Sequence, residues 1–566
     1  MQEEYSSFQE ESNKKPRWDR KESTEHTYLF ERSAIHGVSQ REYAKEAEVP
    51  RTTLQYWLKR KEKLGLSKQV VSFFESPDGL AFLHRLVIAA QFTMTLVGAS
   101  GIRPLSLFLE LSSLSEFVAS SYGSQQKAVS AMEQTIVEFG ANQQAELSVE
   151  MKPKKITVCE DETFHPEICL VAIEPVSNYI LLEEYAKNRD SSTWNEAMEK
   201  NLCGLRVEII QSTADDGTGL VKHIKEGLGA HHSPDLFHVQ HEIVKGTSAA
   251  LCAKIRKASK ELEEAIQATQ KQIDAQKSYE ETIPSHRQGS EALSWFEQRV
   301  KQAKEQEQQA LQNEENAQRC KQITQESNQE LSKIYHPYDL ESGKPKTPEQ
   351  VERALQSQFE IIENQAKEAG LADRAFESIN KAKKQITKMI ATIAFFFQVV
   401  SIKVQALGLP DQIEQILYNN WIPGLYLMRV AKQAQTAKER EILKDQAQLL
   451  LAPIRNRDGP LQYLDSKEFE TIESVAIECA NLFQRSSSCV EGRNGQLSLR
   501  HHSLHRIYPR KLKALTVIHN FFIRRTDGTT AAERFFGAKH KDLFDYLLDR
   551  LDVPCRPAKT RLAYEG

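Results

Sequence analysis

Cysteine pairs, an excess of positive charge and long uninterrupted apolar runs are all missing from this 566-residue sequence. None of its eight cysteines forms a Cys-x-x-Cys pair, which argues against a structural zinc site and a disulfide framework. Reduced thiols in a cytoplasmic setting are therefore the simplest interpretation. The formal net charge of −4 excludes a uniformly basic surface, so binding to nucleic acid would require locally concentrated charge.

Two further absences concern membranes. Residues 1–20 are polar, carry charges of both signs and lack the apolar stretch of a secretory signal. The most apolar segment, residues 386–409, is interrupted by lysine and glutamine side chains, which favours a buried helix over a membrane span. We therefore expect a protein that does not associate with membranes.

The pattern of residues 28–66 is typical of a small helical DNA-binding domain. Ser39 followed by Glu42 is a capping-box signature and predicts a helix over residues 40–46. A short turn then leads to a second predicted helix over residues 51–64. This is the layout of a helix-turn-helix, whose second helix enters the major groove of DNA. An ordinary helical hairpin with a solvated basic face is the alternative.

The second helix of this domain has an apolar and a polar side. Leu54, Trp57 and Leu58 share the apolar face, which would pack against the preceding helix. The residues on its other side are predicted to contact DNA, and they are Arg51, Thr52, Thr53, Gln55, Tyr56, Lys59 and Arg60. Residues 1–27, in front of the domain, are expected to be flexible, and residues 67–150, behind it, to form a helical domain.

From Lys155 the hydrophobic period changes from that of helices to that of strands. Runs typical of strands cover residues 156–159, 168–174, 179–184 and 207–211, with helices expected over 194–202 and 216–228. Residues 235–238 are expected to form a fifth, short strand or a strand-like turn. The fold class predicted for the whole chain is α+β and predominantly helical. Residues 151–245 would form the first part of its catalytic core.

Three adjacent strands, then a fourth strand, a helix and a fifth strand is the order of a ribonuclease-H-like domain, with a mixed five-stranded sheet. In that fold the first strand and the end of the fourth lie side by side. Asp161 and Asp215 would therefore face each other, although they lie far apart in the sequence. Two carboxylates so close repel each other unless a cation lies between them, which suits Mg²⁺.

Three segments resemble the DDE transposases of bacterial insertion sequences. Thr213-Ala214-Asp215-Asp216-Gly217 is similar to the second-aspartate motif, and Asp235-Leu236-Phe237-His238-Val239 to the segment that follows it in those enzymes. Cys489-Val490-Glu491-Gly492-Arg493-Asn494 is similar to the third-acid motif, in which a helical Glu is followed three residues later by Asn. The resemblance covers roughly residues 155–245 and 486–525.

The resemblance implies a site and a reaction. Asp161, Asp215 and Glu491 would be the catalytic residues and the ligands of two Mg²⁺ ions, with Mn²⁺ as a substitute. The enzyme would cleave double-stranded DNA at transposon ends and join the freed 3′-hydroxyl to target DNA. It would act as a homodimer or higher oligomer on DNA, in the bacterial cytoplasm and associated with the nucleoid.

Several assignments within this site have competitors. Glu160 and Glu162 flank Asp161, and the alternation of the strand favours Asp161. Asp216 competes with Asp215, and Asp235 and His238 are candidate auxiliary residues. His231, His232, His238 and His241 also raise a zinc alternative, although neither Cys nor carboxylate stands at a suitable spacing.

Residues 246–484 depart from the strand pattern and are predicted to be a helical insertion. Two segments rich in Glu, Gln, Lys and Ala, residues 248–276 and 291–334, are expected to form an antiparallel coiled-coil arm. The arm would contact DNA or a second subunit, or it would be a solvated spacer.

Residues 485–566 would complete the core with Glu491 and a basic C-terminal region. Arg493 and Asn494, close to Glu491, are predicted to hold DNA at the metals. Three alternatives to a transposase remain at this stage: a catalytically inactive or repurposed DNA-binding protein derived from one, a ribonuclease-H-like nuclease that does not join strands, and a structural coiled-coil protein.

Overall fold

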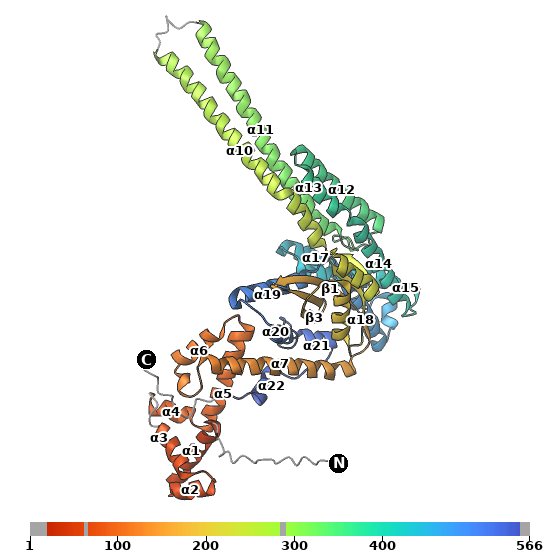
Figure 1. The fold of residues 1–566 in the computed structure, drawn as a ribbon. Helices are drawn as coiled ribbons and strands as arrows, with labels where there is room; N and C mark the ends of the chain where they lie inside the picture. Colours follow the sequence, from red (N-terminus) through yellow and green to blue (C-terminus); the bar gives the residue numbers. More distant parts are fainter. Residues whose placement is uncertain (1–17, 19, 62–65, 283–289, 555–566) are drawn as a thin grey trace, which may run out of the picture. The chain divides into compact units, whose positions relative to one another are not determined.

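The computed structural model describes residues 18, 20–61, 66–282 and 290–554 (Figure 1). The fold is predominantly helical α+β with one mixed five-stranded sheet, as predicted. The chain divides into two compact units, residues 1–151 with 495–566, and residues 152–494. The segment 485–566, expected to complete the core, is thus shared between the two units at Asn494 and Gly495.

The first unit begins with three short helices around a common apolar core. They are α1 (Arg20–Ile35), α2 (Gln40–Glu46) and α3 (Arg51–Lys61). Ser39 and Glu42 form the predicted capping box at the start of α2. The core contains Phe30, Tyr43, Ala44, Val49, Leu54 and Trp57.

The predicted ends of the first two N-terminal segments can be compared with the structure. Helix α1 starts at Arg20, inside the segment 1–27 that was expected to be flexible, and its Ser23, Thr24 and Thr27 are buried. The rest of that segment, residues 1–17 and 19, lies outside the described residues, as does the predicted end of the second helix at residues 62–64.

The remainder of the first unit joins the N-terminal helices to the end of the chain. Its helices are α4 (Lys68–Phe74), α5 (Pro77–Phe92), η1 (Thr93–Val97), α6 (Ile102–Leu111), η2 (Leu114–Glu116), α7 (Tyr122–Glu150), α20 (Pro509–Phe521), α21 (Ala531–Phe536) and α22 (Leu543–Arg550). Helix α7 carries the buried Glu133, which accepts hydrogen bonds from Tyr508 at 2.7 and 3.0 Å. Lys511 lies 3.7 Å from the same carboxylate. Part of the basic C-terminal region is thus used inside this unit.

The second unit contains the sheet. Its strands are β1 (Lys154–His165), β2 (Glu167–Glu174), β3 (Tyr179–Ala186), β4 (Val207–Ala214) and β5 (His231–Pro234), in the order β3-β2-β1-β4-β5. β1, β2 and β3 pair antiparallel, whereas β4 runs parallel to β1 and β5 parallel to β4. Connecting helices are α8 (Ser191–Leu202), α9 (Thr218–Lys222) and η3 (His223–Gly227).

One strand was predicted in the wrong place. The fifth strand is His231–Pro234, and residues 235–238, where it was expected, begin a helix instead. The physical reason is Asp235, whose carboxylate accepts a hydrogen bond from the backbone N–H of Phe237 at 2.8 Å. A side chain that satisfies an N–H group at a helix start favours the helix over a strand.

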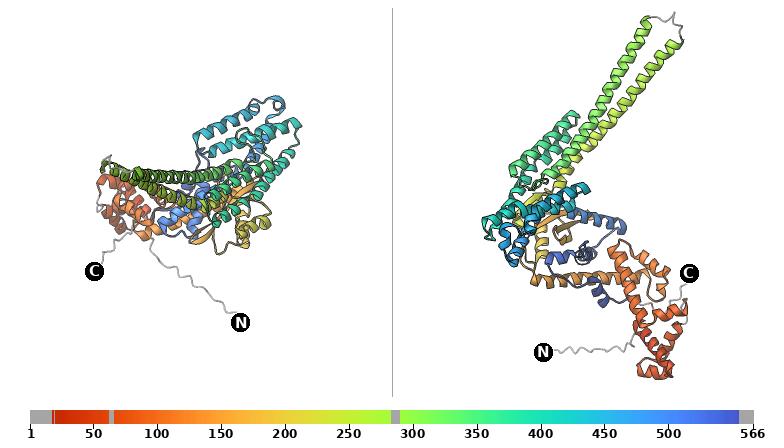
Figure 2. Two further views of the ribbon diagram at one scale, coloured as in Figure 1. Left: turned by 90° about the horizontal axis from the view of Figure 1, so that it is seen from above. Right: turned by 180° about the vertical axis from the view of Figure 1, so that it is seen from behind.

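The described residues of the insertion are mostly helical, with a short non-helical stretch that contains an isolated β-bridge between Tyr338 and Pro345. Helices α10 (Leu236–Thr282) and α11 (Ser290–Ile334) run side by side as the predicted antiparallel arm (Figures 1 and 2). The expected turn between them, residues 283–289, lies outside the described residues. Then follow α12 (Pro348–Glu368), α13 (Asp373–Lys383), α14 (Ile386–Gln405), α15 (Asp411–Ile416), η5 (Leu417–Trp421), α16 (Ile422–Gln433), α17 (Ala437–Arg455), η6 (Gly459–Tyr463) and α18 (Ser466–Leu482).

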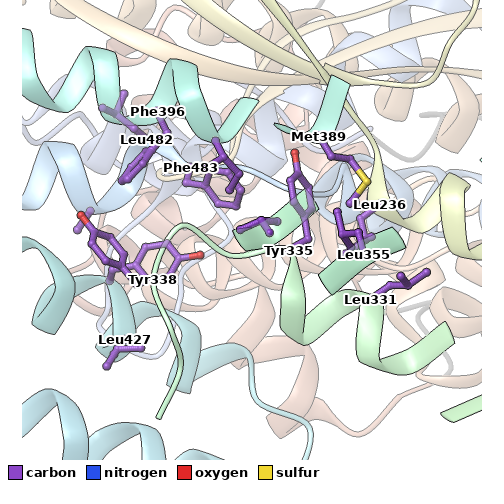
Figure 3. Close-up of a cluster of buried hydrophobic side chains, with 14 of the residues drawn as sticks. Leu236, Leu331, Tyr335, Tyr338, Leu355, Met389, Phe396, Leu427, Leu482 and Phe483 are labelled. Carbon is purple, nitrogen blue, oxygen red and sulfur yellow. The ribbon is translucent and has the colours of Figure 1, made fainter. Parts of the chain in front are cut away.

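A large apolar core joins the root of the arm to the later helices of the insertion. Leu236 at the start of α10 and Tyr335 at the end of α11 belong to the same cluster as Phe396 and Phe483 (Figure 3).

By length and composition, Pro77–Val97 and Asp373–Gln405 could each span a membrane. The second of these includes α14, which contributes Phe396 to this core.

Helices α7 and α20 approach closely at Gly140, which generates a stability prediction. A Cβ atom at this position would lie 2.4 Å from Cγ2 of Val517. Gly140→Ala should therefore destabilise the protein by about 1–3 kcal/mol, the range for overpacked cores. Chemical denaturation of the full chain measures this.

Two further variants control for the change. Gly123→Ala lies on the same helix with open space around it, so it should leave stability unchanged or raise it. Val517→Ala combined with Gly140→Ala should recover part of the loss. An equal loss in the two glycine variants would contradict the close approach.

Candidate active site

Two aspartates lie side by side at one end of the sheet. Strands β1 and β4 are parallel, and Cys159 of β1 pairs with Thr213 of β4. Asp161 and Asp215 each lie two residues beyond that pair, so the predicted neighbours are brought together by the strand register. Asp161 remains within β1, opposite Val171 of β2, and this pairing fixes its backbone.

The three consecutive acids of β1 face different surroundings. The Glu160 carboxylate is buried and accepts a hydrogen bond from Ser212 at 2.6 Å. Glu162 accepts one from the indole N–H of Trp194 at 3.0 Å. Asp161 instead accepts a hydrogen bond from Asn494 at 2.9 Å, on the opposite face of the strand. The geometry favours Asp161 over its two neighbours.

The choice between Asp215 and Asp216 is also informed by contacts. Both carboxylate oxygens of Asp216 lie 2.7 Å from the Lys388 ammonium, and Gln385 donates to the same carboxylate. Burial would raise the pKa of Asp216, but these hydrogen bonds outweigh it and lower the pKa. Asp215 accepts a hydrogen bond from the N–H of Gly217 at 3.0 Å. Asp216 thus ties the insertion to the sheet, which favours Asp215 as the ligand.

Residues 484–487, which precede Glu491, are hydrogen-bonded to side chains of the sheet and of the start of α10. The carbonyl of Gln484 accepts hydrogen bonds from the side chains of Gln211 and Thr213, each at 3.4 Å, and of Ser233 at 3.3 Å. Ser487 then donates to Asp235. Helix α19 (Ser488–Leu504) starts at the next residue, and Glu491 lies in its first turn.

The same segment is held from its other side. Arg429 of α16 donates to the carbonyl oxygens of Ala480 and Phe483, at 3.0 and 2.9 Å, and to the side chain of Gln484 at 2.9 Å. Three acceptors on one guanidinium fix the path of the chain between α18 and α19. No sequence motif marks Arg429, Gln484 or Ser487, so reasoning from the sequence missed all three.

Arg493, predicted to contact DNA, forms an ion pair inside the protein. Its guanidinium donates to both oxygens of Glu183 on β3, each at 2.7 Å, and only 6% of the residue is exposed. This bidentate ion pair holds α19 against the sheet. Its burial argues against the predicted contact of Arg493 with DNA. Asn494, also predicted to hold DNA, hydrogen-bonds Asp161 instead.

The electrostatics show that the acids are gathered. The pKa of Asp161 is raised to about 7, mainly by burial and further by the charges of Glu491 and Asp215, although the N–H of Glu162 and the charge of His238 act in the opposite direction. His238 lies 3.8 Å from Glu491 and 3.9 Å from Asp235. A buried carboxylate that is close to two further carboxylates is an environment that a divalent cation stabilises.

The residues fit a cation by chemistry, but their side chains are not yet in ligand positions. In residues 18, 20–61, 66–282 and 290–554, no three or more His, Cys, Asp or Glu side chains are already arranged to hold a metal ion. Carboxylates are the ligands that Mg²⁺ prefers, and the pKa of Asp161 is raised mainly by burial and in smaller part by the charges of Glu491 and Asp215, both of which a bound cation would offset.

The zinc alternative depended on four nearby histidines, and two of them have other partners. His231 stacks on Phe395 with ring centroids 4.4 Å apart. His232 contacts the backbone carbonyl of Asp215 at 3.2 Å. Asp235, predicted as an auxiliary residue, is buried and bound to Ser487, whereas His238 does lie beside Glu491.

A pocket of about 330 Å³ opens beside Asp215. The loop after β4, the first turns of α10, and Lys381 and Gln385 of the insertion line it. His238 and His241 face it from α10. The insertion therefore forms one wall of a pocket that includes Asp215 of the candidate site.

Comparison with known proteins adds one finding. The model of a family of unknown function, DUF6399, matches residues 417–563. The match includes Glu491 and α19 but neither Asp161 nor Asp215. No curated protein matches the chain.

The buried pair of Arg493 and Glu183 yields a prediction that separates a structural role from a DNA contact. Arg493→Met leaves Glu183 buried without its partner, so the free energy of unfolding should fall by about 3–5 kcal/mol. Adding Glu183→Met should restore most of the loss, because the two methionines replace the pair by apolar groups. Chemical denaturation measures both; if Arg493→Met leaves stability unchanged, the structural role is wrong.

Proposed function

We propose that the chain is a DDE-type transposase that cleaves transposon-end DNA and joins the 3′-hydroxyl to target DNA. The observation that carries this proposal is the convergence of Asp161, Asp215 and Glu491 from two segments of the sequence that lie far apart. The strand order β3-β2-β1-β4-β5 fits the ribonuclease-H-like core that the resemblance implies.

The carboxylates and their neighbours have distinct roles in this proposal. Asp161, Asp215 and Glu491 would hold two Mg²⁺ ions, for which Mn²⁺ would substitute. When bound, such ions activate the attacking oxygen and stabilise the leaving oxygen of a phosphodiester. Asn494 orients Asp161 through its 2.9 Å hydrogen bond, and His238 stands where it can contact a phosphate beside Glu491. The reaction needs no covalent intermediate, so no serine or tyrosine nucleophile is assigned.

The N-terminal helices would supply DNA recognition as a helix-turn-helix. Leu54 and Trp57 anchor α3 in the core, while Arg51, Thr52 and Lys59 are exposed on its outer side. A helix with this division can enter the major groove and place its basic end near phosphates. Transposon ends would be bound by a homodimer or higher oligomer in the bacterial cytoplasm, associated with the nucleoid.

The presence of all three acids favours an active enzyme over a repurposed DNA-binding protein. Asp161→Asn, Asp215→Asn and Glu491→Gln should each abolish Mg²⁺-dependent strand cleavage, because each removes one charged ligand. Binding to the same DNA should stay largely intact. The substrate is DNA that carries the inverted repeats flanking the coding region, and cleaved and joined strands are separated on denaturing gels.

Asp216→Asn is the matched control for these variants. It changes the adjacent carboxylate, which the structure gives to Lys388, so cleavage should persist. Full activity of Asp215→Asn together with loss in Asp216→Asn would transfer the ligand role to Asp216. Cleavage without joining in the parent protein would identify a nuclease instead.

Recognition by α3 is tested separately. Arg51→Ala and Lys59→Ala should weaken binding to the terminal repeat, and each should reduce the salt slope by about 1 if it removes one phosphate contact. Lys61→Ala is the control, because Lys61 is held by Glu31 at 2.7 Å and should not contact DNA. Mobility-shift titrations at several salt concentrations measure this; unchanged affinity in both test variants would remove the N-terminal helices from recognition.

A further inference from the structure

A buried polar network lies on the face of the sheet opposite Asp161. Ser212 of β4 donates to Glu160 of β1 at 2.6 Å, and the other oxygen of Glu160 lies 3.5 Å from Nε2 of His223. The second ring nitrogen of His223 contacts the side-chain oxygen of Asn195 on α8 at 2.5 Å. The network therefore links two strands to two connecting helices.

The members of this network are fully enclosed. Glu160, Ser212 and His223 have no exposed surface. Burying a carboxylate is unfavourable by several kcal/mol unless it is paired, and apolar side chains often fill such a site at least as stably. Stability alone therefore does not explain why this face carries a carboxylate, a hydroxyl and an imidazole.

The network contacts both sequence neighbours of Asp161, which are Glu160 and Glu162. Trp194 stacks on His223, with ring centroids 5.5 Å apart and an interplanar angle of 24°. The indole N–H of the same Trp194 donates to Glu162 at 3.0 Å. Glu160 and Glu162 are thus both held from one face, and Asp161 between them is directed to the other.

The packing around the network leaves little room for adjustment. A Cβ atom at Gly227 would lie 2.0 Å from the side-chain oxygen of Asn195. Residues His223–Gly227 form a π-helix, a local departure from α-helical geometry that is frequent at functional sites. The close approach of η3 to α8 keeps His223 over Glu160.

We propose that Glu160, Ser212, His223 and Trp194 are positioning residues that set the separation and direction of the Asp161 and Asp215 carboxylates. The hydrogen bond from Ser212 to Glu160 cross-links β1 to β4 immediately before those strands deliver the two aspartates. This inference rests on the proposed metal-dependent function. Groups that orient metal ligands from behind typically change metal affinity 10–100-fold when they are removed.

The test compares two buried serines that make the same kind of bond. Ser212→Ala removes the donor to Glu160 without altering charge. Ser177→Ala removes a buried donor to Glu174, at the turn between β2 and β3. Both variants should lower the melting temperature, but only Ser212→Ala should weaken Mn²⁺ binding, by about 10–100-fold. Mn²⁺ binding is measured on the full chain by electron paramagnetic resonance titration.

Two more variants test the same network if Ser212→Ala fails to fold. Ser212→Thr retains the hydroxyl and should retain Mn²⁺ affinity. Trp194→Phe keeps a ring over His223 but removes the N–H donor to Glu162, so Mn²⁺ affinity should fall while affinity for DNA stays unchanged.

The outcomes separate this inference from the function on which it rests. Ser212→Ala and Trp194→Phe binding Mn²⁺ as tightly as the parent protein, with only melting temperatures lowered, would reduce the network to a structural role. Absence of Mn²⁺ binding in the parent protein itself would overturn the metal site, and the positioning proposal with it. Equal weakening in Ser177→Ala would show a general effect of loosening the sheet and would also overturn the proposal.

Discussion

The candidate site depends on one set of hydrogen bonds that fastens a four-residue segment across the sheet. Gln484 offers a single carbonyl to three side chains from β4 and β5, and Ser487 reaches Asp235 at the start of α10. Together with the ion pair of Arg493 and Glu183, these contacts bring Glu491 close to Asp161. A long insertion separates the third acid from the first two, so the entropy of closing so long a loop must be offset here.

The strand β1 shows how one element serves two tasks. Its alternation sends Asp161 toward α19, whereas Glu160 and Glu162 point to α8 and η3. A polar residue at each of three consecutive positions would be costly on a strand buried on both faces, unless every carboxylate has a partner. Glu160 and Glu162 each accept a hydrogen bond within the protein, whereas Asp161 lies among other acids and its pKa is raised to about 7, mainly by burial.

Local signals in the sequence predicted much of the architecture, because they depend on neighbouring residues. The period-two runs predicted four of the five strands close to their observed places, and the capping box at Ser39 predicted the start of α2. The fifth strand was misplaced because Asp235 caps a helix, a role that a short apolar run conceals. Arg493 was predicted to contact DNA from its position close to Glu491, whereas its partner in the structure is Glu183, which lies more than 300 positions away in the sequence. Long-range partners of this kind, including Arg429 and Gln484, leave no trace in local sequence patterns.

The chain leaves the sheet at Leu236 and returns to it at Arg485. These two residues are joined directly, because the N–H of Leu236 donates to the carbonyl of Arg485 at 2.9 Å. The chain between them is therefore closed at its base by a backbone hydrogen bond, a feature called the neck below. Arm length and loop content beyond this neck can change without altering the distance that the backbone must bridge at the site. The outer part of the arm can therefore vary in length while the helices of the insertion that contact the site, which carry Lys388 and Arg429, keep the three acids in place.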